Sequence, residues 1–416
     1  MTAPITHIVG AGLAGLSAAI RLTQAGKRVL VHEAAGQAGG RCRSYHDPAL
    51  DMIIDNGNHL LLSGNHATLA YVQAIGAADR LVGPATAEFP FIDLATNERW
   101  TLQPNEGRIP WWIFNAARRV PGTRPQDYLS LLPFLWASSE ATITEVINSK
   151  TTLYSRLWQP VLLAALNTDP KEASARLAAA IIRETFLAGG RACRPLIARD
   201  GLAEAFVEPA LRHLEASGAP VKFGRRLRAL SFDGRSVTVL DFGEDTIALG
   251  PNDTIILAVP PTVAAALLPG LQTPDEFRAI VNAHYRVDPP PGCPAMIGVI
   301  NGVAEWVFAF PGRLSVTISG ADRLLETPRE TLARDIWRDV VAATGVADTL
   351  PAWQIVRERR ATFAAVPQQD SKRPAAKTDW DNLVLAGDWT ATGLPATIEG
   401  AVRSGNRAAD LVSKRG

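Results

Sequence analysis

Cysteine, methionine and tyrosine are scarce in this chain, and neither sign of charge dominates it. Its 416 residues include three cysteines, three methionines and five tyrosines, and 42 Lys and Arg nearly balance 41 Asp and Glu for a net charge of +1. Cys42, Cys193 and Cys293 lie far apart, without the spacing of a zinc site or a disulfide framework. We therefore expect no metal ion and a reducing compartment, and the balanced charge predicts no nucleic-acid partner.

Long apolar runs are also missing. No stretch of about 18 apolar residues is present, which argues against a transmembrane helix, and the N-terminal residues do not form a secretory signal. We therefore expect a cytoplasmic protein. The chain is longer than the roughly 250–300 residues at which single cores stop growing, and 47% of it is hydrophobic, so two globular domains are expected.

The first forty residues contain a dinucleotide-binding pattern. A short apolar strand-like run ends at Val9, the glycines of a GxGxxG turn follow, and residues 16–25 favour a helix. A second strand, residues 28–32, ends at Glu33, whose carboxylate can accept hydrogen bonds from a ribose diol. The helix N-terminus can bind phosphate through its free N–H groups. The residues assigned to the cofactor here are Gly10, Gly12, Leu13, Ala14, Gly15, Glu33 and Ala34.

The next segment distinguishes between dinucleotides. Gly39, Gly40 and Arg41 offer unobstructed backbone donors and a forked cation for a diphosphate. The run from 39 to 44 resembles the GGR continuation of FAD-dependent amine oxidases and carotenoid-type desaturases. That resemblance implies FAD as the cofactor.

The C-terminal region matches the second flavin motif of the same superfamily. Residues 382–386 read as a buried strand that is followed by Gly387 and Asp388, and a helix opens near residue 395. The resemblance implies that Asp388 binds the ribityl or phosphate region and that the backbone N–H near Ile398 faces the flavin N1/C2=O edge. It also implies that Leu227 contacts the adenine through its backbone.

This resemblance predicts an α/β fold with a Rossmann-like FAD-binding domain built from discontinuous segments and an inserted α+β substrate domain. We assign residues 1–85, 196–262 and 353–416 to the FAD-binding domain. Residues 86–195 and 263–352 are assigned to the substrate-binding domain, and the ligand pocket is expected between the two.

Several motifs narrow the resemblance to one family. The chain resembles the squalene-associated flavoproteins known as hydroxysqualene dehydroxylases in the segments 55–62, 157–168, 360–363 and 387–401. One position differs, because Asn58 stands where Gln is expected. The implied reaction removes the allylic hydroxyl of an apolar C30 isoprenoid, hydroxysqualene, to give squalene by hydride transfer from reduced FAD. An external electron donor must then reduce the flavin.

The reaction needs a proton donor, and His59 is our candidate. Its loop should lie near the flavin, and the ordinary pKa of histidine suits proton transfer. A histidine that only orients the loop or the flavin has similar weight. Gly57 and Asn58 are assigned to the cofactor, and Asp55 is expected to cap the loop.

Aromatic residues between 105 and 190 suggest an apolar substrate pocket, and two other interpretations stay open. They form a domain core more often than a ligand wall. Alternatively, Trp111 and Trp112, beside Arg108, Arg118 and Arg119, would seat a surface helix in a bilayer interface, as peripheral membrane contact for a lipid-derived substrate. Motif and composition do not indicate an oligomeric state.

Four other functions compete with this hypothesis. A phytoene-type desaturase shares the fold but runs the hydride from substrate to oxidised flavin, and the direction of transfer is not encoded in a motif. An amine oxidase is disfavoured because tyrosines for an aromatic cage are few. Prenyl-binding Rab escort proteins share the fold but perform no flavin chemistry, and an NAD dehydrogenase lacks the flavin motifs. This chain has the glycine motifs, Arg41 and Asp388 together, which disfavours both alternatives.

Overall fold

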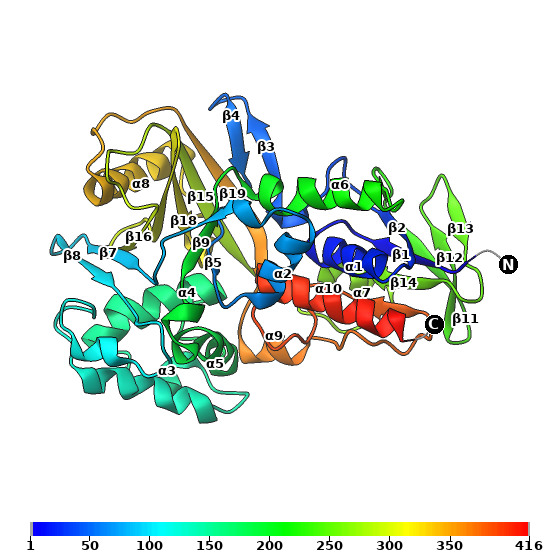
Figure 1. The fold of residues 1–416 in the computed structure, drawn as a ribbon, viewed down its shortest axis with the longest axis horizontal. Coiled ribbons are helices and arrows are strands. Elements are labelled where there is room, and N and C mark those ends of the chain that lie inside the picture. Colours follow the sequence, from blue (N-terminus) through cyan, green and yellow to red (C-terminus); the bar gives the residue numbers. More distant parts are fainter. Residues whose placement is uncertain (1–2, 415–416) are drawn as a thin grey trace.

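Two sheets organise the computed structural model, which describes residues 3–414. One sheet has five strands and the other has seven. Figure 1 shows the first sheet with its helices at one end of the molecule and the second at the other end, with a group of helices beneath it. We call these parts the five-stranded domain, the seven-stranded domain and the helical lobe. The α/β class expected from the sequence is confirmed.

The five-stranded sheet is parallel and is assembled from distant parts of the chain. Its order is β10-β2-β1-β14-β20. The strands are β1 (Ile5–Val9), β2 (Arg28–His32), β10 (Val221–Lys222), β14 (Thr254–Leu257) and β20 (Leu383–Leu385). Strands from all three predicted FAD-binding segments are therefore neighbours in one sheet.

Helices α1 (Leu13–Gln24), α6 (Glu208–Ala216) and α10 (Ile398–Ser413) pack against this sheet. Helix α2 (His66–Ala74) packs on α10, and α7 (Pro261–Leu267) follows β14 in the chain. A Cβ on Gly405 would lie 2.0 Å from the Ser17 Oγ and 2.2 Å from the Ala14 carbonyl oxygen. Helices α1 and α10 therefore approach closely because position 405 has no side chain. An antiparallel sheet of β11 (Ala229–Asp233), β12 (Ser236–Asp241) and β13 (Thr246–Ala248) completes this domain.

The seven-stranded sheet has the order β19-β15-β18-β17-β16-β7-β8 and is antiparallel except between β16 and β7. The strands are β7 (Phe89–Asp93), β8 (Glu98–Leu102), β15 (Phe277–Arg286), β16 (Met296–Ile300), β17 (Trp306–Phe310), β18 (Arg313–Ile318) and β19 (Trp353–Phe363). Helix α8 (Arg329–Thr344) covers one apolar face of the sheet. Because β19 pairs with β15, we propose that the FAD-binding domain resumes after Phe363 rather than at residue 353.

The helical lobe is the part of the inserted segment that lies beyond β8. It contains α3 (Ile143–Val146), α4 (Gln159–Leu166), α5 (Ala175–Glu184) and the 3₁₀ segments Trp111–Phe114 and Pro125–Trp136. Short elements link the parts: β3 (Ser44–Asp47), β4 (Met52–Asp55), β5 (Leu61–Leu62), β6 (Leu81–Val82), β9 (Pro195–Ala198) and α9 (Pro367–Ser371). No helix within residues 3–414 is long and apolar enough to cross a membrane.

Candidate functional site

Two glycine loops meet beyond the carboxyl end of β1. Gly12 and Gly39 form an isolated bridge, and the Gly39 N–H donates to the Ala11 carbonyl oxygen at 2.8 Å. A Cβ on Gly12 would meet no heavy atom within 4 Å, and one on Gly40 would meet only the Gly12 Cα at 3.5 Å. No side chain caps the N-terminus of α1. Open space therefore lies beside free N–H groups, which suits a diphosphate.

Gly10 and Gly15 act differently from Gly12. Gly10 has a φ of +106°, and a Cβ there would lie 2.5 Å from the Ala258 carbonyl oxygen. A Cβ on Gly15 would lie 1.9 Å from the Gly10 carbonyl oxygen. These two glycines hold β1, α1 and the loop after β14 together, whereas Gly12 leaves room for a ligand.

Glu33 stands at the end of β2, where the ribose was predicted. Its Oε2 accepts from the Ala11 N–H at 2.7 Å, and its Oε1 accepts from the Ala35 N–H at 2.8 Å. Each oxygen keeps a lone pair for a further donor. The Arg225 N–H donates to the Glu33 carbonyl oxygen at 2.8 Å, so the segment that contains buried Leu227 lies beside this acid, as an adenine contact would require.

Arg41 bridges the N-terminal and C-terminal motifs. Its Nη1 donates to the Ala361 carbonyl oxygen and its Nη2 to Asp388 Oδ1, both at 2.7 Å. The Asp388 carboxylate is the main cause of the raised pKa of Arg41. The Arg41 side chain is 46% exposed. It keeps unused donors for the predicted diphosphate contact, but its ion pair already fixes the two motifs against each other.

The C-terminal motif turns sharply into α10. Gly387 has a φ of +150°, its N–H donates to the Ser404 Oγ at 2.9 Å, and a Cβ there would lie 2.3 Å from the Trp389 Nε1. Helix α10 begins at Ile398 behind the Thr397 cap, whose hydroxyl accepts from the Gly400 N–H. The predicted N–H near Ile398 is therefore in the first turn of a helix, where the dipole favours negative charge.

Comparisons with known proteins agree with this geometry. Residues 13–413 match the family model of flavin containing amine oxidoreductases. A hydroxysqualene dehydroxylase of Rhodopseudomonas palustris is 61% identical over 99% of this chain and 98% of its own length. The chain belongs to the hydroxysqualene dehydroxylase family.

More distant proteins share the fold of this dehydroxylase family member. The hydroxysqualene dehydroxylase of Zymomonas mobilis is 47% identical over 98% of both chains, and a probable zeta-carotene desaturase of Synechococcus elongatus is 23% identical over 97% of both. A solved structure of putrescine oxidase has a TM-score of 0.71 at 17% identity and covers 99% of both chains. The protein is an FAD-dependent oxidoreductase, and the open space between its glycine loops fits that cofactor.

The loop after β4 joins the two domains of this dehydroxylase family member. Asp55 is buried, and its Oδ1 accepts from the Ser44 Oγ at 2.6 Å and from the Leu202 N–H at 2.8 Å, which favours the expected capping role. The Asn58 Nδ2 donates to the Thr317 Oγ1 of β18 at 3.1 Å. A Cβ on Gly57 would lie 3.0 Å from an amide nitrogen of β15, so this glycine permits the docking.

His59 follows in the same loop and is half-buried. Burial lowers its pKa to about 4, the Asp55 carboxylate raises it by less, and Arg41 lowers it further. Within residues 3–414 the ring makes no hydrogen bond, so both nitrogens are available to a ligand. The imidazole is therefore neutral at pH 7 in the free protein, and it must take up a proton before it can donate one.

Two buried residues that the motifs did not indicate position these loops. Arg373 donates through Nη2 to the carbonyl oxygens of Asp388 at 3.0 Å and Thr390 at 2.5 Å, and through Nη1 to Asp370 Oδ1 at 3.0 Å. Asn282 of β15 donates to the Asn56 carbonyl oxygen at 3.3 Å. A lone arginine such as Arg373 carries no sequence signal. Asn282 carried a weak one, because it is a polar residue within an apolar strand.

The face of the seven-stranded sheet opposite α8 has a polar part and an apolar part. Near the Asn58 loop it presents Asn282 and Thr317, which hydrogen bond to each other at 2.8 Å. Elsewhere it carries apolar and aromatic side chains that join one buried cluster with the helical lobe. These are Phe89, Phe91, Met296, Trp306, Phe308 and Phe310 from the sheet, and Tyr154, Leu157 and Trp158 from the lobe. This region suits an apolar ligand.

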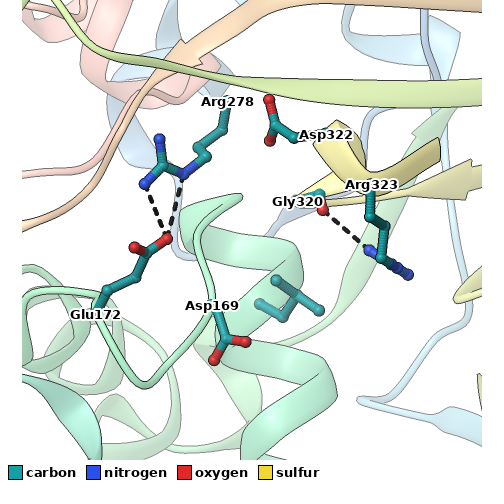
Figure 2. Close-up of a pocket in the computed structure, with 7 residues that line it drawn as sticks. Asp169, Glu172, Arg278, Gly320, Asp322 and Arg323 are labelled. Atoms are coloured by element: carbon teal, nitrogen blue, oxygen red, sulfur yellow. Dashed lines mark hydrogen bonds and ion pairs between the residues drawn. The ribbon is translucent and has the colours of Figure 1, made fainter. Parts of the chain in front are cut away.

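A cavity of about 440 Å³ lies elsewhere, between α4 with the α4–α5 connection on one side and β15 with the segment after β18 on the other (Figure 2). It is lined by Leu163, Asp169, Glu172, Arg278, Gly320, Asp322 and Arg323. Arg278 pairs with Glu172 at 2.9 Å, as the dashed lines in Figure 2 mark. No predicted site residue lines this cavity, and its charged wall does not suit an isoprenoid. Within residues 3–414 no group of three metal-ligating side chains is present.

Proposed function

We propose that this protein reductively removes the hydroxyl group of hydroxysqualene to give squalene, with FAD as the cofactor. The observation that carries the proposal is the 61% identity, over 99% of the chain, to a protein named hydroxysqualene dehydroxylase. The substitution of hydrogen for hydroxyl consumes one hydride and one proton and releases water. Reduced FAD, when bound, supplies the hydride, and an external electron donor must restore it.

The residues of this chain would hold the cofactor at both ends. Gly12 and Gly40 would present backbone N–H groups to the diphosphate, Gly39 joins the two loops through its bond to Ala11, and Glu33 would accept from the ribose. The first turn of α10, at Ile398, stabilises negative charge at the flavin edge. The Arg41–Asp388 ion pair, 2.7 Å long, keeps the two motifs in register.

The apolar sheet face would exclude water from the reacting carbon. Phe91, Trp306 and Phe308 are each less than 10% exposed, and they border the helical lobe rather than solvent. Loss of hydroxide from an allylic alcohol leaves a carbocation that water would capture. An apolar wall at the reacting carbon would keep water away from that cation, so that hydride from the reduced cofactor could reach it first.

We propose His59 as the proton donor to the departing hydroxyl. Its unpaired ring nitrogens and its place beside the glycine loops support the role. Since its pKa is about 4, the protonated fraction rises as the pH falls toward that value. We expect kcat/KM of the wild type to increase as the pH is lowered from 7, and His59→Gln to lose this slope together with about 100-fold of activity at pH 6.

The exposed His66 provides the matched control, because His66→Gln removes an imidazole without touching the site. FAD absorbance of each variant must equal that of the wild type, so that lost activity reflects chemistry. A His59→Gln enzyme that keeps both rate and pH slope would leave the histidine with an orienting role only.

The function itself is tested by anaerobic incubation of the FAD-loaded protein with hydroxysqualene and chemically reduced flavin, followed by mass spectrometry of the extracted lipids. We expect squalene only when enzyme and reduced flavin are both present. Unchanged hydroxysqualene, with FAD binding verified by absorbance, would contradict the proposal. Oxidation of a polyisoprenoid by the oxidised enzyme would favour a desaturase instead.

We further propose a cytoplasmic location with peripheral contact at the inner face of the membrane. An apolar C30 substrate partitions into lipid, and the helical lobe exposes aromatic side chains beside arginines.

A further inference from the structure

Large apolar side chains are exposed mainly in one region of the molecule. Of the ten such side chains within residues 3–414, seven belong to the helical lobe and three are scattered elsewhere. We call the seven the anchor face: Ile109, Trp111, Phe114, Leu129, Leu132, Trp136 and Leu187. Trp136 is 77% exposed and Phe114 is 64% exposed. Single exposed apolar residues are ordinary, but seven from three neighbouring segments are not.

Hydrogen bonds place these segments side by side. The Gly190 N–H donates to the Asn105 carbonyl oxygen at 2.8 Å, which joins the start of the first segment to the turn that follows Leu187. The Arg183 Nη2 donates to the Leu135 carbonyl oxygen at 3.4 Å, which joins α5 to the segment Pro125–Trp136. The rings of Trp111 and Phe114 lie 6.2 Å apart. The anchor face is therefore built from adjoining segments.

The anchor face is not the exposed edge of an ordinary core. In Pro125–Trp136 the inward side chains Tyr128, Leu131 and Phe134 are already buried. The outward positions of the same segment carry Leu129, Leu132 and Trp136. A surface segment in water usually places polar residues there, so this pattern suits a segment with an apolar partner on its outward side.

Positive charge accompanies the anchor face. Arg108, Arg124, Arg183 and Arg191 are exposed in these segments. The carboxylates of these segments are Asp127, Glu106, which pairs with Arg191 at 3.1 Å, and Glu184, which pairs with Arg403 at 2.7 Å. Tryptophan and arginine together suit the boundary between lipid hydrocarbon and anionic headgroups, where the ring is buried and the guanidinium stays at the phosphates.

We propose that the anchor face docks on an anionic lipid bilayer, with Trp111, Phe114 and Trp136 inserted at the interface and the arginines at the headgroups. The proposal names the partner of the peripheral contact in the proposed function. Buried aromatic rings continue inward from this face: Trp112 packs edge-on against Tyr128 at 5.0 Å, and Tyr128 against Trp158 at 6.4 Å. The docked lobe thus connects lipid with the apolar cluster beside the sheet.

The test measures flotation of the full-length, FAD-loaded protein with phosphatidylcholine vesicles that contain or lack phosphatidylglycerol. We expect binding that is stronger with phosphatidylglycerol and weaker in high salt. The triple variant Trp111→Ser, Phe114→Ser, Trp136→Ser should lose at least about tenfold in partitioning. Its control, Ile53→Ser with Val263→Ser, removes exposed apolar side chains outside the anchor face and should bind as the wild type does.

Charge is tested separately with Arg108→Gln and Arg124→Gln. Each should weaken binding to phosphatidylglycerol vesicles roughly fivefold and leave binding to pure phosphatidylcholine unchanged. A triple variant that floats like the wild type would overturn the proposal. The proposal would also be wrong if the wild type did not bind vesicles but formed a dimer in solution, and the triple variant did not form this dimer. A second copy of the chain would then cover the anchor face. No substrate is present in these assays, and dehydroxylation in detergent micelles tests the reaction independently.

Discussion

The five-stranded domain and the helical lobe use side chains in opposite ways. In the five-stranded domain, small residues and glycines bring backbones together, as at Gly15 and Gly405, and few large side chains are exposed. In the lobe, bulky side chains fill the interior and also cover the outside. We attribute the first pattern to close contact between backbones and with the cofactor, and the second to the bilayer contact that we propose.

The largest expected effect comes from the lobe interior. Phe134 is 1% exposed, and Phe134→Ala should lower the free energy of unfolding by about 3–5 kcal/mol because it leaves a cavity. Trp136→Ala, two positions along, removes a 77% exposed ring and should change it by less than about 0.5 kcal/mol. Urea denaturation followed by circular dichroism measures both. A large loss in Trp136→Ala would show that this ring packs within the protein and would remove it from the anchor face.

Arg373 tests whether the five-stranded domain depends on buried charge as well as on glycine. Its side chain is 1% exposed, and it holds the loop after β20 through two carbonyl groups. Arg373→Met should cost about 3 kcal/mol of stability, since Asp370 and those carbonyls lose a buried donor.

The control for Arg373 is Arg176→Met. Arg176 pairs with the same Asp370 but is 54% exposed, so its loss should cost less than about 1 kcal/mol. Equal thermal stability of the two variants would contradict a structural role for the buried arginine. FAD release on mild heating, followed by fluorescence, should also begin earlier in Arg373→Met.

Sequence motifs predicted the parts of the site where backbone geometry dictates the residue. Gly10 and Gly15 leave no room for a side chain, and Glu33 ends its strand where the fold needs an acceptor. Arg373 and Asn282 were missed because their roles depend on partners distant in sequence. The strand β19 depends on a distant partner in the same way, because its pairing with β15 is the reason that we propose a boundary later than residue 353.

Acid should weaken the five-stranded domain through His32. The Nε2 of this buried ring lies 3.2 Å from the Nδ1 of His7, and the ring packs against Phe242 at a tilt of 31°. Burial lowers its pKa to about 3, with smaller contributions from His7, Arg225 and Lys222, while Asp245 opposes them. The unfolded chain takes up a proton below pH 6.5 and the folded protein does not until about pH 3. The contribution of His32 to the free energy of unfolding is therefore fully present above pH 6.5 and is lost as the pH falls toward 3.

From pH 6.5 to pH 5 the loss should be about 2 kcal/mol for this histidine. Urea denaturation at both pH values measures it, and His32→Phe should remove most of that difference. His66→Phe makes the same change at an exposed position and should keep the pH dependence of the wild type. If the free energy of unfolding of His32→Phe fell between pH 6.5 and pH 5 as much as that of the wild type, other groups would cause the acid sensitivity.

The smallest expected effect on stability is that of a substitution at Gly12. This substitution should change FAD affinity while leaving the free energy of unfolding almost unchanged. A methyl group there meets no protein atom, so Gly12→Ala should change the free energy of unfolding of the FAD-free protein by less than about 0.5 kcal/mol. The same methyl group occupies the space assigned to the diphosphate, so FAD affinity, measured by flavin fluorescence, should fall at least about tenfold. Gly36→Ala, which also meets no atom within 4 Å, should leave both unchanged. If Gly12→Ala bound FAD normally, the open space between the glycine loops would not be the diphosphate site.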